Sequence, residues 1–204
     1  DLCLQDRLNH ACLIDGARLA DATLQRYRHG DSADAERLLR ATPERRALLV
    51  TDSVFSMDGD IAPMRPLAEL AQRERAWLMV DEAHGLGVLG PQGRGACAAA
   101  GLSAVEVPVW MGTLGKALGG CGALIAGSDA LIDALVNGAR SYIYTTALPP
   151  ALAQAMVVAV ELARNADAER AQLQALIAHF RSGAAELGWT LLPSATPIQP
   201  LLVG

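Results

Sequence analysis

Four short apolar runs, unbroken by alternating polar residues, constrain the fold more than any other feature of this chain. They cover residues 47–51, 76–80, 107–111 and 122–126. Runs of this length and character are typical of parallel strands that are covered on both faces. Helical patterns lie between them, so we expect an α/β fold with a mainly parallel sheet flanked by helices.

The expected helices are recognised by capping residues, by Pro in a first turn and by Gly after an end. They cover residues 31–40, 67–74, 129–137 and 150–180. Ser128 and Gly138 flank the third, and a break near Asn165 interrupts the fourth.

Composition limits the function classes that are open to the chain. Its 204 residues are 51% hydrophobic and 19% charged, which favours a packed core over disorder. The formal charge of −5 argues against binding to nucleic acid or to an anionic membrane surface. No apolar run reaches the roughly 18–20 residues of a membrane span. We therefore expect neither nucleic acid nor a membrane as a partner.

The cysteines and the two ends of the chain give three further expectations. Cys3, Cys12, Cys97 and Cys121 lack metal-ligand spacing, so we expect reduced, buried thiols and a cytoplasmic protein. The chain begins with Asp rather than Met and stops within an apolar run that is typical of a starting strand. We expect a segment of a longer protein, with an incomplete large domain over 1–180. Residues 181–204 would be the crossover and the start of a truncated C-terminal small domain.

Polar side chains follow three of the expected strands. They are Asp52, Ser56 and Asp58 after the first, Asp81, Glu82 and His84 after the second, and Thr113 and Lys116 after the third. Because ligands bind outside the carboxyl ends of strands in an open α/β sheet, we expect these groups to face one crevice. Lys116 is the one lysine among 17 basic residues. Unlike Arg, lysine can become a neutral amine nucleophile, although a single surface lysine needs no such role.

Three other kinds of site fit the sequence poorly. Two residues separate Gly112 from Gly115, and Ala117 follows Lys116. An ATPase phosphate loop has four residues between its glycines and Ser or Thr after its lysine. No GxSxG motif surrounds the serines near the strands, which disfavours a serine hydrolase. His10, His84 and Asp81 lack supporting ligand spacing, so no metal is expected.

A lysine amine, a carboxylate and an imidazole together suit pyridoxal 5'-phosphate (PLP). This cofactor needs an amine for its aldehyde, a carboxylate for its pyridine nitrogen, and polar groups for its phenolic oxygen and its phosphate. Lys116, Asp81, His84 and Thr113 meet these needs, so we expect PLP as the cofactor.

Seven motifs that together are specific carry a resemblance over nearly the whole chain. They lie at Asp6–His10, Arg26–Asp31, Thr51–Asp60, Val80–Gly85, Gly93–Gly95, Gly112–Gly119 and Tyr144–Pro150. With them the chain resembles the α-oxoamine synthases, which are fold-type I PLP enzymes. The resemblance implies a large domain like that of aspartate aminotransferase and a PLP-dependent acyltransferase activity.

The resemblance also implies catalytic roles. Lys116 would form the Schiff base with PLP and later move the α-proton of the substrate. Asp81 would pair with the pyridine nitrogen. His10 would stack on the cofactor ring and assist proton transfer, whereas without the resemblance it would be an ordinary loop histidine.

Further roles in cofactor binding are implied for side chains that would otherwise belong to turns and caps. Ser56 and His84 would hydrogen-bond the phenolic oxygen, and Thr113 would contact the phosphate. Thr145 and Thr146 would reach the phosphate of a partner subunit's cofactor. That role requires a homodimer with a shared active site.

The implied reaction is a decarboxylative condensation of an amino acid with an acyl thioester. Residues 55–63 and 142–150 favour L-alanine and a pimeloyl thioester, on CoA or acyl carrier protein, as in biotin biosynthesis. Glycine C-acetyltransferase is the first alternative, followed by aminolevulinate synthase and serine palmitoyltransferase. From another class, the chain could be an inactive truncated paralogue that acts as a dimerisation partner.

Three positions depart from the family pattern, and regions that the family uses lie outside this sequence. Gly30 stands where Asn is usual, Cys12 where Ser is common and Glu82 where Asp is frequent. The regions before and after this segment would supply backbone contacts to the phosphate and an arginine for the substrate carboxylate. We therefore expect the 204-residue segment alone to bind PLP weakly or not at all.

Overall fold

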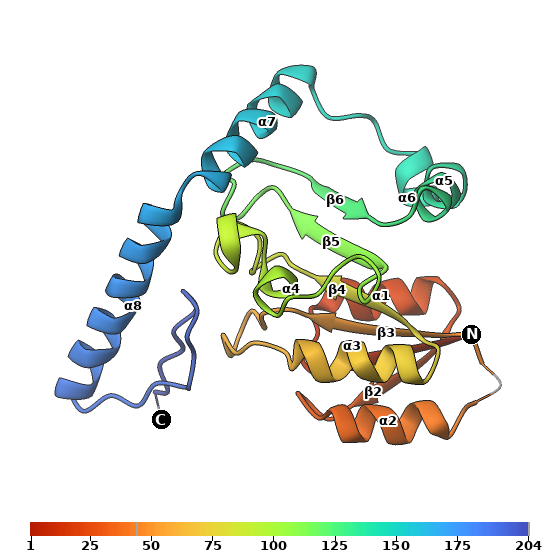
Figure 1. Ribbon diagram of the computed structural model, residues 1–204, viewed down its shortest axis with the longest axis horizontal. Coiled ribbons are helices and arrows are strands. Elements are labelled where there is room, and N and C mark those ends of the chain that lie inside the picture. The colour runs from red at the N-terminus through yellow and green to blue at the C-terminus, as the bar shows by residue number, and fades with distance from the viewer. Residues whose placement is uncertain (44, 204) are drawn as a thin grey trace.

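A six-stranded sheet forms the centre of the computed structural model, which describes residues 1–43 and 45–203 (Figure 1). The strands are β1 (Leu2–Asp6), β2 (Thr23–Tyr27), β3 (Ala47–Asp52), β4 (Trp77–Asp81), β5 (Val109–Thr113) and β6 (Ala123–Ala126). Their order in the sheet is β2-β1-β3-β4-β5-β6. All neighbours pair in parallel except β5 and β6, which pair antiparallel. The predicted α/β fold with a mainly parallel sheet is confirmed.

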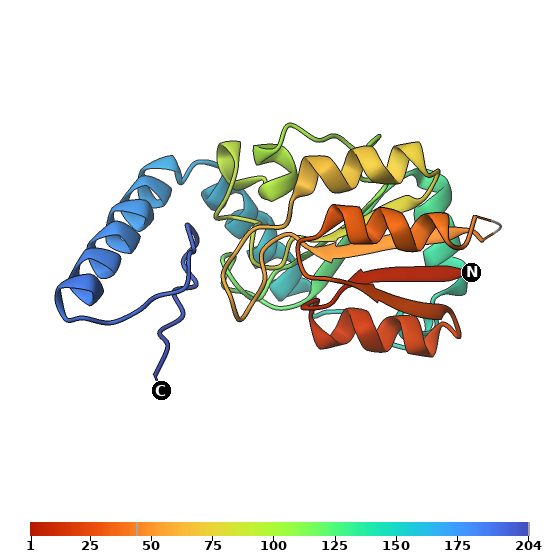
Figure 2. The ribbon, with the colours of Figure 1, turned by 90° about the horizontal axis from the view of Figure 1, so that it is seen from below.

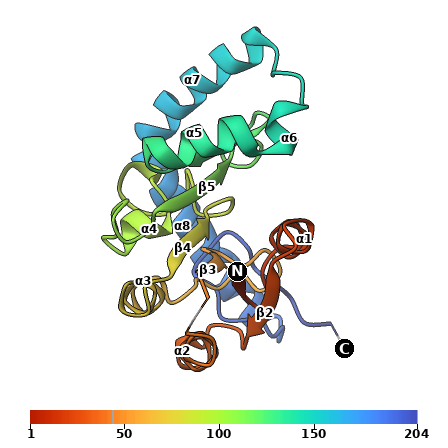
Figure 3. The ribbon, with the colours of Figure 1, turned by 90° about the vertical axis from the view of Figure 1, so that its right-hand side faces the viewer.

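Helices cover both faces of the parallel part of the sheet. They are α1 (Ala11–Leu19), α2 (Ser32–Arg40), α3 (Met64–Arg73), α4 (Ala96–Ala99), α5 (Asp129–Gly138), α6 (Arg140–Ile143), α7 (Pro150–Arg164) and α8 (Asp167–Glu186), with a 3-10 turn at Pro91–Gly93. Seen along the sheet, α1 lies on one side of the strands and α2 and α3 on the other (Figure 3). The larger core packs beneath α2 and α3, where Leu4, Leu49, Leu67 and Leu78 are fully buried.

The elements predicted from the sequence are present, with shifted ends. Asp31 caps α2 by accepting a hydrogen bond of 2.9 Å from the Asp34 N–H. The predicted break at Asn165 is confirmed, because α7 ends there and α8 begins at Asp167. Helix α8 continues past Phe180 to Glu186. No helix of the described residues is both long and apolar enough to cross a membrane.

Three expectations from the sequence need correction. The fourth apolar run forms β6, which pairs antiparallel with β5. This strand is exposed along its length, because it is the last strand of the sheet and no strand pairs with its outer side in the described part of the chain. Cys12 and Cys121 are exposed rather than buried, since they lie in the first turn of α1 and in the loop before β6. The expected strand at 201–204 is a single bridge between Leu191 and Leu201, and Gly204 lies outside the described residues.

The segment after α8 returns to the carboxyl ends of the strands. Helix α8 and this segment lie beyond that edge of the sheet (Figure 2). The hydroxyls of Ser194 and Thr196 both donate to the Gly59 carbonyl, at 2.8 and 2.9 Å. Arg170 of α8 donates to the carbonyl of Ala163, at 2.6 Å, and to that of Gly87, at 3.3 Å. The segment after α8 therefore contacts the loop that follows β3, and α8 contacts the loop that follows β4.

Candidate active site

The connections that leave β1 and β3 diverge at the carboxyl ends of these neighbouring strands. The chain leaves β1 for α1 on one face of the sheet and leaves β3 for α3 on the other (Figure 3). In an open α/β sheet, such a point of divergence opens a crevice where ligands bind. Asn9 and His10 follow β1, and Asp52 ends β3.

Two buried aspartates lie side by side at this edge. The register of the sheet pairs Asp52 with Asp81, and the two are only 4% and 3% exposed. Asp81 accepts a hydrogen bond of 2.8 Å from the Ala83 N–H. Asp52 accepts one of 2.7 Å from the His10 N–H. Each carboxylate is thus fixed by the backbone of a neighbouring loop.

Burial and neighbouring negative charges raise the pKa of both carboxyl groups. Burial raises the pKa of Asp52 to about 7, and the charges of Asp81 and Asp6 add to the rise. Burial also raises the pKa of Asp81, while the Ala83 N–H and the charges of Lys116 and His10 oppose the rise. Cationic groups beside the pair therefore favour its ionised form.

Three basic side chains near the pair come from loops after three different strands. Lys116 lies in the exposed loop between β5 and β6, and its charge lowers the pKa values of both aspartates. Burial lowers the pKa of His84, and the charges of Lys116 and His10 lower it further. His84 is therefore a neutral imidazole near pH 7, able to donate one hydrogen bond and accept another. The structure brings His10, Asp81, His84 and Lys116 together at one edge of the sheet.

The predicted hydroxyl groups lie in different surroundings. Thr113, the last residue of β5, has a buried Oγ1 atom without a hydrogen-bond partner among the described residues. Ser56 is half-buried in the turn after β3. Thr145 and Thr146 are exposed in the linker between α6 and α7, and the hydroxyl of Thr145 donates to the Ser141 carbonyl. No hydrogen bond among the described residues joins this threonine pair to the carboxylates.

Glu82 has a structural role that the sequence did not indicate. It is fully buried, and its carboxylate accepts hydrogen bonds from the Ser53 hydroxyl at 2.8 Å, the Ala96 N–H at 2.9 Å and the Cys97 N–H at 2.7 Å. Gly95 has a φ of 95°, and a Cβ there would lie 2.6 Å from the Glu82 Cδ. The Gly-Arg-Gly motif therefore packs on the carboxylate that follows Asp81.

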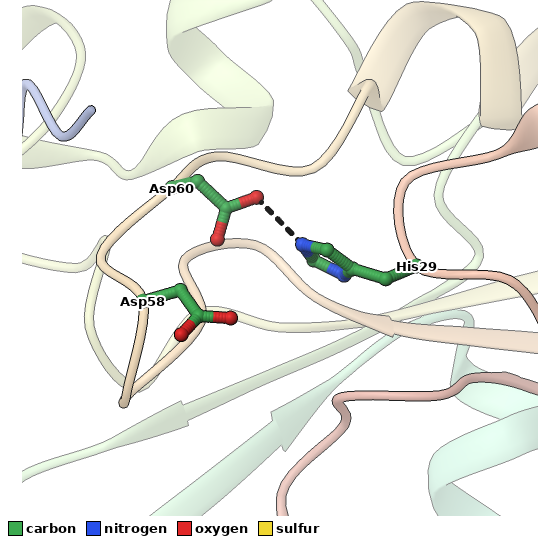
Figure 4. Close-up of side chains that lie close together, drawn as sticks. All are labelled: His29, Asp58 and Asp60. Atoms are coloured by element: carbon green, nitrogen blue, oxygen red, sulfur yellow. Dashed lines mark hydrogen bonds and ion pairs between the residues drawn. The ribbon is translucent and has the colours of Figure 1, made fainter. Parts of the chain in front are cut away.

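His29 joins two loops close to this edge. Its Nδ1 atom lies 3.0 Å from the Asp6 carboxylate. Its Nε2 atom lies 2.9 Å from the Asp60 carboxylate (Figure 4). His29, Asp58 and Asp60 bring ligand atoms within 4.8 Å of one another. Both nitrogens of the ring are already engaged by carboxylates, so the contacts fit a structural role for His29.

Comparison with known proteins identifies relatives of the whole chain. The sequence model of the family "Aminotransferase class I and II" matches residues 1–204. The 8-amino-7-oxononanoate synthase of Xanthomonas oryzae pv. oryzae is 57% identical over 204 residues, which are 100% of this chain and 51% of that protein. That of Xanthomonas axonopodis pv. citri is 56% identical over the same length. The chain therefore spans about half the length of these curated relatives.

Solved structures show the same architecture. A structure of serine palmitoyltransferase from S. paucimobilis with a bound PLP–myriocin aldimine superposes with a TM-score of 0.94 at 28% identity, covering 100% of this chain and 53% of that one. The 8-amino-7-oxononanoate synthase of Francisella tularensis superposes with a TM-score of 0.86 at 33% identity, covering 100% of this chain and 59% of that one. Since the family model matches from the first residue to the last, the chain belongs to the class I and II aminotransferase family.

Proposed function

We propose that this chain is part of a PLP-dependent 8-amino-7-oxononanoate synthase. The enzyme would condense L-alanine with a pimeloyl thioester, releasing carbon dioxide and the free thiol carrier. The observation that carries the proposal is the convergence of Lys116, Asp81 and His84 at one sheet edge, in a chain 57% identical to an enzyme of that name. The amine, carboxylate and imidazole are the donor set that PLP needs.

The residues at this edge fit the cofactor. Lys116 would bond its aldehyde, and Asp81 would hold its pyridine nitrogen in the protonated form. The neutral imidazole of His84 supports its hydrogen bond to the phenolic oxygen, with Ser56 as the second donor. Thr113 offers a buried hydroxyl without a partner among the described residues, which would bond the phosphate. When bound, PLP supplies an electron sink for the substrate carbon.

The chain's own side chains would then handle the protons. The Lys116 amine would take the α-proton of the amino acid and later return a proton to the product. His10, in the turn after β1, would cover the ring and assist at the substrate carbonyl. Asp81 must be ionised for its role, which the positive charge of Lys116 favours.

The shared site would require a homodimer. The Thr145 and Thr146 pair is exposed and makes no described hydrogen bond to this chain's own carboxylates, which supports a role toward a partner subunit's phosphate. We further propose that residues 1–180 belong to the large domain and 181–204 to the passage into a small domain. A cytoplasmic location stays a prediction.

Borohydride trapping tests the proposal. PLP is added to this chain and to the longer enzyme, the imine absorbance is recorded, and the reduced adduct is mapped by mass spectrometry. We expect label on Lys116 in the longer enzyme and none in Lys116→Arg, which keeps the positive charge beside Asp81 but cannot form the imine. Absence of label in both proteins would overturn the PLP assignment and favour the inactive dimerisation partner.

Substrate pairs separate the remaining alternatives. We expect carbon dioxide release with L-alanine and a pimeloyl thioester to exceed that with glycine and acetyl-CoA. The reverse preference would assign the chain to glycine C-acetyltransferase instead. Comparing pimeloyl-CoA with the acyl carrier protein thioester would identify the acyl carrier.

A further inference from the structure

The Asn9 side chain continues the pairing of β1 with β3 beyond the end of the strands. The two strands pair up to Gln5 and Val50. The Asn9 amide then donates to the Val50 carbonyl at 2.9 Å and accepts from the Asp52 N–H at 3.0 Å. Asn9 is 5% exposed, so both bonds are shielded from water. The amide thus takes the position of a strand backbone and fixes the turn to β3.

Asp52 holds the next residue of the same turn. Its backbone bonds Asn9, while its carboxylate accepts the His10 N–H at 2.7 Å. These are long-range contacts between residues more than 40 positions apart. Asn9 is therefore bonded to the backbone of Val50 and Asp52, and His10 to the Asp52 carboxylate.

Contacts at the start of α1 favour one tautomer of the His10 ring. His10 is the N-cap of α1, and its Nδ1 accepts from the Cys12 N–H at 3.3 Å. The Cys12 Sγ lies 3.0 Å from the same nitrogen. A neutral ring whose Nδ1 accepts must carry its proton on Nε2. Nε2 is therefore the ring nitrogen that can donate a proton beyond the turn.

We propose that Asn9 and Asp52 are positioning residues for His10. Together they hold the turn that presents the His10 ring, as its Nε2–H tautomer, at the crevice between β1 and β3. The reaction that His10 serves rests on the function proposed above. The placement of the turn rests only on contacts within this chain.

A purely electrostatic role for Asp52 predicts different results. In that case its charge would act on Lys116 and Asp81, and removing the charge alone would be damaging. Asp52→Asn removes the charge but keeps an oxygen that can accept the His10 N–H. Asp52→Ala removes both, and Asn9→Ala releases the turn from the opposite side.

The first test reads the His10 ring in the cofactor-free longer enzyme. Nitrogen-15 NMR of the His10 ring reports which ring nitrogen carries the proton. We expect the Nε2–H tautomer in the wild type and in Asp52→Asn, and a mixture in Asp52→Ala and Asn9→Ala. Asp34→Ala is the matched control, because Asp34 is also buried and accepts a backbone N–H, that of Arg28 at 2.8 Å, in a different turn. An unchanged tautomer in both Ala variants would overturn the proposal.

The second test is a double-mutant cycle on the condensation rate. Misplacing a reacting group by about 1 Å can lower a rate on the order of 100-fold, so we expect Asp52→Ala to lower kcat by about 10- to 100-fold. Asp52→Asn should recover most of this loss. In a His10→Ala background, Asp52→Ala should cost much less, because the ring that it positions is gone. Full additivity would overturn the proposal. Failure of the wild type to bind PLP or to condense substrates would refute only the proposed function, since the NMR result does not depend on either.

Discussion

The carboxylate of Glu82 provides the sharpest test of how this site is supported. It is fully buried and accepts three hydrogen bonds of 2.7–2.9 Å, two of them from the backbone of the 96–97 segment. A buried donor that loses its partner costs about 1–3 kcal/mol. The three losses are not additive, because the space left by the side chain can admit water. We therefore expect Glu82→Ala to lower the free energy of unfolding by roughly 3–5 kcal/mol.

The isosteric variant separates hydrogen bonding from packing. Glu82→Gln keeps the shape and one acceptor oxygen, but its amide would face a backbone N–H that also donates. We expect a loss of about 2 kcal/mol, between those of the wild type and Glu82→Ala. Glu106→Ala is the matched control, because Glu106 also accepts from a serine hydroxyl and a backbone N–H, both of Ser103, but does so at the surface. It should be the least destabilising of the three.

Urea unfolding followed by far-UV circular dichroism measures these differences. The comparison is valid where the dependence on urea concentration has the same slope in all variants. If Glu82→Ala were no less stable than Glu106→Ala, the three bonds would not support the loop that packs beside Asp81, and the reasoning would be wrong.

Three further predictions concern pH and the cofactor. In the cofactor-free protein the pKa of Asp52 is raised from 3.8 to about 7, so between these pH values the folded state binds a proton that the unfolded state has released. Stability therefore falls as pH rises from about 4 to about 7. Urea unfolding of Asp52→Asn should show no such fall. Burial alone lowers the pKa of His29, but the hydrogen bonds and charges of Asp6 and Asp60 outweigh it and raise the pKa above 6.5. The resulting stability is complete below about pH 6.5 and is lost as pH rises through the raised pKa, so a His29→Gln variant with an unchanged pH profile would contradict the contact. Thr113→Val should weaken PLP binding about tenfold or more in an absorbance titration, since a hydrogen bond to a charged group contributes about 1.5–3 kcal/mol. The cofactor-free variant should lose no stability. Equal affinity for PLP would show that the hydroxyl does not bond the phosphate.

The sequence predicted the strands and helices whose patterns are local. The apolar run at 47–51 and the capped helix after Asp31 are each specified by a few neighbouring residues. Strands β1 and β2 were not predicted, because Gln5 and Gln25 interrupt their short apolar patterns. The antiparallel direction of β6 is a tertiary property, since an exposed apolar strand and a buried one have similar sequences.

The sequence could predict only those site residues whose type itself suggests a chemical role. Lys116 and Asp81 were found because a single lysine and a carboxylate after a buried run suggest a function. Asn9 drew no attention as a residue, since its importance comes from bonds to residues 50 and 52. Glu82 was expected to face the crevice with Asp81 and His84, but its carboxylate is buried against the 96–97 backbone, which nothing local in the sequence indicates.

The two hydroxyls on the Gly59 carbonyl couple the C-terminal segment to the turn that carries Ser56. Gly59 closes this turn through its N–H, which bonds the Phe55 carbonyl at 2.8 Å, while its carbonyl bonds Ser194 and Thr196. Gly59 therefore belongs both to the turn and to the contact that holds the segment. If a ligand that binds at the turn stabilises the contact between Gly59 and the segment, then that contact raises the affinity for the ligand by the same factor. Cooperativity between cofactor binding and the seating of the C-terminal segment would then need no contact between the two.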